Sequence, residues 1–439
     1  MSGPERAELA PELAEELALT ALGWLAAGCA VGVLLALLLA WPDGNALLAP
    51  LTYGRWVPVH LDLMLYGWTA LPLVGLLLRV YLPGAAGARA GRIALAGWSG
   101  ALGAGSLALL GGGSSGKLFL EIRGPAEILF LAALVLLWGT LVGGFVRKLR
   151  TEPRPHGRVV AARAAVLLLL ATVPLAMAAA LDPRGYPPID PTTGGPTGTD
   201  LLASTLAILP IFLALPALLD LERTPRAPRA SLLWTLFAAH TALLPWFGFG
   251  DRLHGDPRQV LAIASVLVWP WPLARHLLGH VWPAGSRRWL AALGVWGTLL
   301  ATSALLTYWP GVLDRVKFTH ALVGHAHLAM AGFTTSFAAL LLHALLRDSA
   351  VADALAAPRP FALWQVGTAL HVAAMVALGA LEAADAGALG RPDLRVTALF
   401  ALRGLAGLAM LAAALDWLAR VARTASLGAG ASAEAEAAT

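Results

Sequence analysis

The sequence predicts an all-α polytopic membrane protein with about twelve spanning helices. Its 439 residues are 58% hydrophobic and only 13% charged, whereas a soluble domain carries about 25% charged residues. Apolar runs of about 20 residues, the length at which a helix crosses a bilayer, recur from one end of the sequence to the other. These observations predict one membrane domain over residues 17–425 and leave no room for a sizeable soluble domain.

Twelve apolar runs give the expected order of the spanning helices. Residues 1–16, which precede them, are acidic and rich in alanine. They predict a short cytoplasmic amphipathic segment rather than a cleaved signal peptide, because no basic stretch comes first. Residues 426–439 consist mainly of Ala, Gly, Ser and Glu and predict a disordered cytoplasmic tail. The runs begin near residues 17, 56, 92, 127, 161, 201, 229, 258, 288, 318, 361 and 394.

Arginine and lysine residues are concentrated in alternate loops. The loop between the fourth and fifth runs carries Arg147, Lys148, Arg150, Arg154 and Arg158, and loops of this kind face the cytoplasm. The pattern predicts a multi-pass protein of the bacterial inner membrane with both termini in the cytoplasm. It also accounts for the net charge of +5, so we expect no binding to nucleic acid.

The single cysteine, Cys29, lies in the first apolar run. It cannot form an intrachain disulfide or a zinc–thiolate site, and the Cys-x-x-Cys-His attachment of c-type haem is excluded as well.

Three histidines stand at the start of the run near residue 318: His320, His325 and His327. An ionisable residue inside a membrane span is costly and marks a candidate functional site. On an α-helix, residues two apart lie about 200° apart around the axis. His325 and His327 therefore cannot bind one metal together, but each can reach a different cofactor. The alternative is that all three are hydrogen-bonded to neighbouring helices.

A further histidine, His60, opens the second run. Both this run and the one near residue 318 are expected to start at the outer face, with His60 roughly 6 Å and His327 roughly 12 Å inside. Two imidazoles from separate helices at this depth are what ligation of one haem iron by two histidines requires. Arg55 lies one turn above His60 and could pair with a haem propionate. Its alternative role is a snorkelling arginine at the interface.

These motifs resemble subunit I of the haem–copper oxidase superfamily, in particular the branch of C-type cytochrome c oxidases and nitric oxide reductases. The stretch from Thr52 to His60 is similar to the Phe-Gly-Arg-x-x-Pro-x-His motif that opens the second helix there. The stretch from His320 to His327 is similar to the His-x4-His-x-His motif of the tenth helix, and Arg403-Gly in the last run loosely resembles an Arg-Gly-x-Gly-Gly segment.

The resemblance implies roles for the histidines. His60 and His327 would be the axial ligands of a low-spin haem b, and His325 would bind a second, high-spin haem, whose presence is left open. His320 and Arg55 would lie near haem propionates.

The chain departs from the family where a second metal would be held. The family uses one histidine in its sixth helix and an adjacent pair at the seventh. Here the sixth run has no histidine, the seventh has only His240, and Gly250-Asp251 stand where the pair is expected. A site so poor in histidine does not hold copper or non-haem iron, so we expect the binuclear centre to be lost or altered. His240 is either a remnant ligand or a hydrogen-bonded core residue.

Other polar residues in or beside the runs have simpler interpretations. His371 is isolated in the eleventh run; a hydrogen-bonded core histidine is favoured there over a ligand. Asp62 is a candidate proton or hydrogen-bond partner inside the membrane. Glu121 and Glu127 flank Arg123 and predict a local ion network.

The expected function is respiratory electron transfer through a low-spin haem, with other respiratory subunits or a periplasmic cytochrome c as partners. One alternative is an enzyme, a terminal oxidase or nitric oxide reductase with an altered metal site. The others are a non-enzymatic structural subunit of a respiratory complex and a transporter unrelated to haem.

Overall fold

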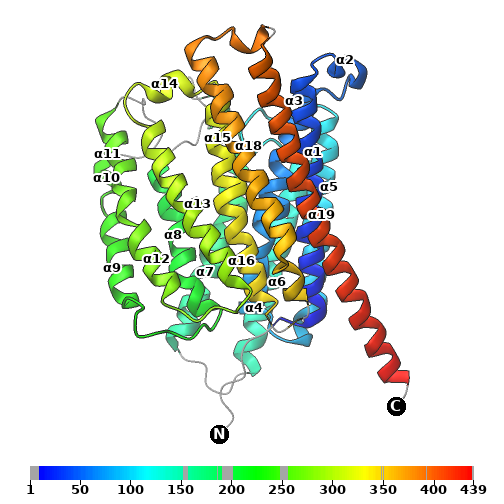
Figure 1. Cartoon of the computed structure of the whole chain (residues 1–439). Helices are drawn as coiled ribbons and strands as arrows, with labels where there is room; N and C mark the ends of the chain where they lie inside the picture. The colour runs from blue at the N-terminus through cyan, green and yellow to red at the C-terminus, as the bar shows by residue number, and fades with distance from the viewer. Residues whose placement is uncertain are drawn as a thin grey trace.

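The computed structural model describes residues 9–151, 157–184, 186–189, 201–247, 256–347, 349, 351–391 and 393–437. In this part of the chain eleven helical segments are long and apolar enough to cross a membrane, and a shorter apolar helix, α8, lies between the fifth and the sixth of them. The described residues form no β-strand beyond isolated bridges. The predicted all-α polytopic fold is thereby confirmed (Figure 1).

The spanning elements follow the predicted order. Short helices α2 (Gly44–Leu48) and α14 (Val312–Val316) lie in the loops at the upper end of Figure 1. The long elements are α1 (Pro11–Ala40), α3 to α4 (Tyr53–Tyr81), α5 (Ala85–Leu110), α6 (Pro125–Thr151), α7 (Gly157–Leu181), α8 (Leu201–Leu218), α9 to α10 (Ala230–Phe247), α11 to α12 (Pro257–Leu278), α13 (Ser286–Thr307), α15 to α16 (His320–Leu345), α17 (Val351–Leu355) with α18 (Pro358–Ala384), and α19 (Leu394–Ala437).

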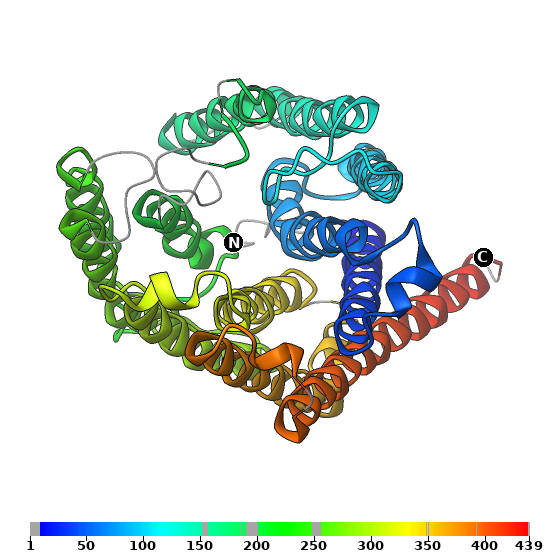
Figure 2. The same cartoon turned by 90° about the horizontal axis from the view of Figure 1, so that it is seen from above.

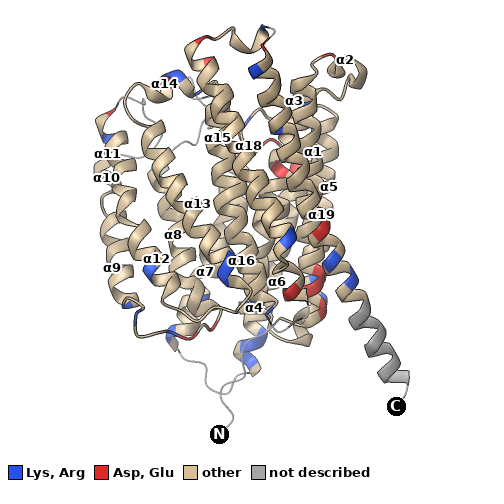
Figure 3. Ribbon diagram, in the orientation of Figure 1, with Lys and Arg blue, Asp and Glu red and all other residues tan. Residues whose placement is uncertain are grey.

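Seen along their axes, the helices follow one another around a ring, and the last helix, α19, packs against the first, α1 (Figure 2). Charged residues lie mainly near the two ends of the bundle, and the ribbon between them is largely uncharged (Figure 3). This distribution is the one a bilayer imposes, because a charge in hydrocarbon is costly. The few charged groups away from the ends therefore mark positions of interest.

Two of the spans contain a π-helical stretch, and both stretches follow a candidate haem ligand. Leu63–Thr69 (η1) begins three residues after His60, and Leu328–Thr334 (η3) begins directly after His327. Short π-helical insertions occur frequently at functional sites. Upstream, the Thr319 side chain accepts a hydrogen bond from the Ala321 backbone N–H at 3.2 Å, which caps the N-terminus of α15.

Glycines allow the helices around these stretches to approach closely. A Cβ added at Gly379 of α18 would overlap the backbone of Ala321 in α15, and a Cβ at Gly324 would lie 3.2 Å from Val376. On the other side, Gly28 and Gly32 of α1 face the helix that carries His60. Small residues are the usual means of close helix packing inside membranes. They bring α1, α3, α15 and α18 together around one region.

The two ends of the chain differ from the prediction. Residues 11–16 are not a separate segment but the first turns of α1, which runs unbroken from Pro11 to Ala40. Pro11 at the first helical position and Glu12 in the first turn both favour a helix start there. The proposed tail is helical as far as Ala437, at the end of α19. Residues 1–8 lie outside the described part of the chain.

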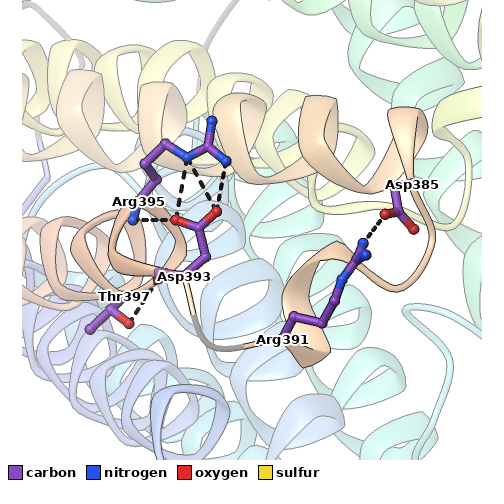
Figure 4. Close-up of polar contacts among 5 residues, drawn as sticks. All are labelled: Asp385, Arg391, Asp393, Arg395 and Thr397. Carbon is purple, nitrogen blue, oxygen red and sulfur yellow. Dashed lines mark hydrogen bonds and ion pairs between the residues drawn. The ribbon is translucent and has the colours of Figure 1, made fainter.

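Two exposed charged pairs lie at the connection between α18 and α19 (Figure 4). Arg391 pairs with Asp385. Asp393 accepts hydrogen bonds from the Arg395 backbone N–H at 2.7 Å and from the Arg395 guanidinium, also at 2.7 Å. The Asp393 carboxylate thus satisfies a free N–H at the start of α19.

Candidate functional site

His60 lies in a notch on α1. Its Nδ1–H donates to the backbone carbonyl of Gly28 at 2.8 Å, and a Cβ at Gly32 would lie 2.9 Å from Cε1 of the ring. Because a carbonyl oxygen only accepts, the proton of the neutral ring is on Nδ1, and Nε2 keeps its lone pair. A ring held by its other nitrogen in this way is typical of histidines that bind metals.

His327 is held in the same manner by its own helix. Its Nδ1–H donates to the Val323 carbonyl, one turn earlier, at 2.9 Å. The same reasoning leaves the lone pair on Nε2.

The two rings lie close together although 267 positions separate them. Their centres are 6.3 Å apart and their planes differ by 19°. Metal–imidazole bonds of about 2 Å place two trans nitrogens about 4 Å apart and, with roughly 1 Å from each nitrogen to its ring centre, the centres about 6 Å apart. The observed spacing therefore fits two imidazoles on opposite sides of one metal.

A buried cation stands beside this pair. Arg403 of α19 is only 6% exposed, and its Nε and Nη1 atoms have no hydrogen-bond partner among the described residues. An unpaired buried charge is strongly destabilising, and a guanidinium is well suited to a carboxylate. The residues present thus fit a haem, whose propionates would supply the missing anion.

His371 of α18 also lies beside His327 and Arg403. This position of His371 was not predicted from the sequence. Its Nδ1–H donates to the Arg403 carbonyl at 3.1 Å, and its ring centre lies 4.9 Å from that of His327 with the planes at 50°. It is hydrogen-bonded, as predicted, but it is not isolated.

The other histidines of the motif face different neighbours. The Ser303 hydroxyl donates to the Leu300 carbonyl at 3.1 Å, so it accepts from Nδ1–H of His325 at 2.9 Å. His325 therefore points to α13 and also keeps a lone pair on Nε2. His320 binds Glu382 through its backbone N–H and Nδ1, at 2.7 and 2.9 Å.

Arg55 donates from Nη1 to the Leu110 carbonyl at 2.6 Å, which ties the start of α3 to the end of α5. Contact of Arg55 or His320 with a propionate stays a prediction.

His240 has partners for both ring nitrogens. The Trp269 indole N–H donates to Nδ1 at 2.8 Å, so the ring proton is on Nε2, 2.8 Å from the Ser265 hydroxyl. This arrangement supports the hydrogen-bonded core histidine and leaves the neutral ring no nitrogen for a remnant metal ligand.

Gly250 and Asp251, where the family would place its histidine pair, lie outside the described residues. Within the part of the chain that the structure describes, no three His, Cys, Asp or Glu side chains gather as a metal site.

A carboxylate pair lies on the far side of α3. Asp62 is fully buried beside Glu121, itself 5% exposed, and no described group donates a hydrogen bond to either Asp62 oxygen. The loop of residues 111–124 covers the pair and is tied down where Tyr66 donates to the Phe119 carbonyl at 2.5 Å. Glu121 faces Asp62. Its burial is therefore not the result of the predicted ion network with Arg123.

Because Asp62 and Glu121 are buried together, we expect the stability of the protein to depend on pH. Burial raises the pKa of Glu121, which lies outside the spans, from 4.5 to about 7. Between these values the folded protein holds a proton that the unfolded chain releases, so the free energy of unfolding falls as pH rises from about 4.5 to 7, by an amount on the order of 3 kcal/mol. Glu121→Gln should flatten this fall in unfolding measurements across pH. Glu127→Gln, at the rim of the same pocket, is the matched control and should leave it in place.

One comparison with known proteins bears on the site. Residues 13–196 match the family model described as cytochrome c and quinol oxidase polypeptide I. The matched segment is less than half of the chain; it includes His60, and it ends before the helices that carry His327, His371 and Arg403. A search of curated proteins gave no match.

Proposed function

We propose that this chain is a member of the haem–copper oxidase subunit I superfamily that holds a low-spin haem b between His60 and His327 and serves respiratory electron transfer. The match of residues 13–196 to the family model supports this proposal. The observation that carries the proposal is the 6.3 Å spacing of the two rings. A haem with two axial histidines exchanges single electrons and offers no open position to a substrate.

Each residue around the pair has a defined task in this proposal. The Gly28 and Val323 carbonyls keep the ring protons on Nδ1 and so keep Nε2 of His60 and His327 available as a ligand atom. The Arg403 guanidinium would neutralise a propionate. The apolar helices around them exclude water, and a low-polarity surrounding influences the reduction potential of such a site.

The visible spectrum of the purified protein tests the proposal. We expect a sharp b-type α-band in the reduced-minus-oxidised spectrum and about one haem or more per chain. A protein that is purified folded from haem-replete cells and has no α-band would leave the structural subunit or the transporter as the better description.

A second, five-coordinate haem on His325 is part of the proposal, because Ser303 engages Nδ1 of this ring and leaves the lone pair on Nε2 for a ligand. If such a haem is present, carbon monoxide should change the reduced spectrum, and His325→Ala should abolish that change while the low-spin α-band persists. Loss of both features together would mean that His325 acts on the fold rather than on a separate haem. Absence of any carbon monoxide response in the wild type would argue for one haem only.

We place the chain in the bacterial inner membrane with both termini in the cytoplasm, on the strength of the basic loops. The first residues of α1 and the end of α19 lie at the same end of the bundle in Figure 1, which agrees with this topology. His60 and His327 would then lie toward the periplasmic side. An electron donor would be a periplasmic cytochrome c or a haem-bearing partner subunit.

A further inference from the structure

Near His327 lies a third histidine whose Nε2 keeps its lone pair, although a haem with two axial ligands needs only two such histidines. His60, His327 and His371 each donate Nδ1–H to a backbone carbonyl, those of Gly28, Val323 and Arg403. All three rings therefore carry their proton on Nδ1 and their lone pair on Nε2. His371, on a third helix, thus has the same tautomer as the two proposed ligands.

His371 differs from a second buried histidine, His240, in how its ring nitrogens are used. His371 is 7% exposed, and within the described chain only its Nδ1 is engaged in a hydrogen bond. His240 shows the alternative, because Trp269 and Ser265 occupy both of its nitrogens. Nε2 of His371 therefore has no hydrogen-bond partner among the described residues, unlike either nitrogen of His240.

Position makes His371 a neighbour of His327 rather than of His60. The ring centres of His327 and His371 are 4.9 Å apart, less than the roughly 6 Å that two trans ligands of one metal require. The two histidines therefore cannot bind the iron together on opposite sides of a porphyrin. They can replace each other on one side.

We propose that His371 is a reserve axial ligand, which binds the haem iron opposite His60 when His327 does not. The proposal rests on the proposed haem. In the exchange the iron–Nε2 bond of His327 breaks and one to Nε2 of His371 forms. No proton is transferred and the oxidation state of the iron does not change, because both nitrogens are already unprotonated. The His371 side chain must rotate to do this, with loss of its bond to the Arg403 carbonyl.

Four variants in a full-length background test the exchange: His327→Ala, His371→Ala, the double variant, and His343→Ala as a control. His343 is a buried histidine bonded to Ser286 at 2.8 Å, away from the three rings. Haem per chain, the reduced α-band and the low-spin signal in electron paramagnetic resonance are measured for each. Added imidazole serves as a probe, since it can supply a missing ligand to a folded site.

We expect His327→Ala to keep a low-spin haem with shifted resonance positions, and the double variant to lose the low-spin signal and regain it with imidazole. His371→Ala and His343→Ala should resemble the wild type. The proposal is overturned if His327→Ala is high-spin or free of haem. A wild type without haem would sink the proposed function itself, whereas a low-spin wild type with a high-spin His327→Ala variant would sink only the reserve ligand.

Discussion

Replacing His60 with alanine is expected to abolish the low-spin haem. The iron would lose its only ligand on the α3 side, and His327 and His371, with centres 4.9 Å apart, cannot span a porphyrin in its place. Loss of a partner that merely orients a ligand lowers metal affinity by about 10–100-fold, so loss of the ligand itself should lower the affinity for the low-spin haem at least tenfold. Haem per chain and the reduced α-band measure the effect.

Two controls separate loss of the ligand from loss of the fold. His240→Ala removes a buried histidine whose nitrogens are both paired elsewhere, and it should keep the haem. Gly32→Leu leaves His60 in place but fills the notch where a Cβ would lie 2.9 Å from the ring, so it should reduce haem content as well. Gly23→Leu is its match on the same helix, where nothing lies within 4 Å of the added Cβ. A haem complement equal to the wild type in His60→Ala would refute the assignment.

The spans and their order were predictable because the bilayer imposes one simple rule, about 20 apolar residues for each crossing. The positive loops and the two histidine motifs then predicted that His60 and His327 would lie at comparable depths, and their rings do lie together in the structure. Helix ends were less predictable. The span near residue 318 starts at His320 because Thr319 caps it, and the first span starts earlier than expected because Pro11 and Glu12 favour a helix start.

His371 and Arg403 were named from the sequence but were not placed beside His60 and His327, and the reason is physical. They lie 32 positions apart on antiparallel helices, and no spacing rule connects such residues across a turn. One signal was present: Arg403 is a cation inside an apolar run with no acidic residue within one helical turn, and an unpaired intramembrane charge indicates a functional site. The π-helical stretches after His60 and His327 have no such signal in the sequence.

Gly379→Leu is expected to be the most disruptive single change outside the histidines. A Cβ at this position overlaps the backbone nitrogen and Cα of Ala321, the second residue of α15. A flexible side chain could move aside, but helix backbone cannot, so α15 and α18 would have to separate. Overpacking in a well-packed interior costs about 1–3 kcal/mol and occasionally more, and the upper part of that range applies where the obstacle is backbone.

Separation of α15 from α18 would also affect the candidate haem site, because α15 carries His320, His325 and His327. Separation of α15 from α18 would break the contacts of His320 with Glu382 and displace His327 from both His371 and His60. Gly379→Leu should therefore lower the free energy of unfolding and the haem content together. Gly139→Leu, where an added Cβ meets nothing within 4 Å, should change neither in unfolding and haem measurements. A Gly379→Leu protein with wild-type stability would mean that α15 and α18 do not pack this closely, and the placement of His327 would fail with that contact.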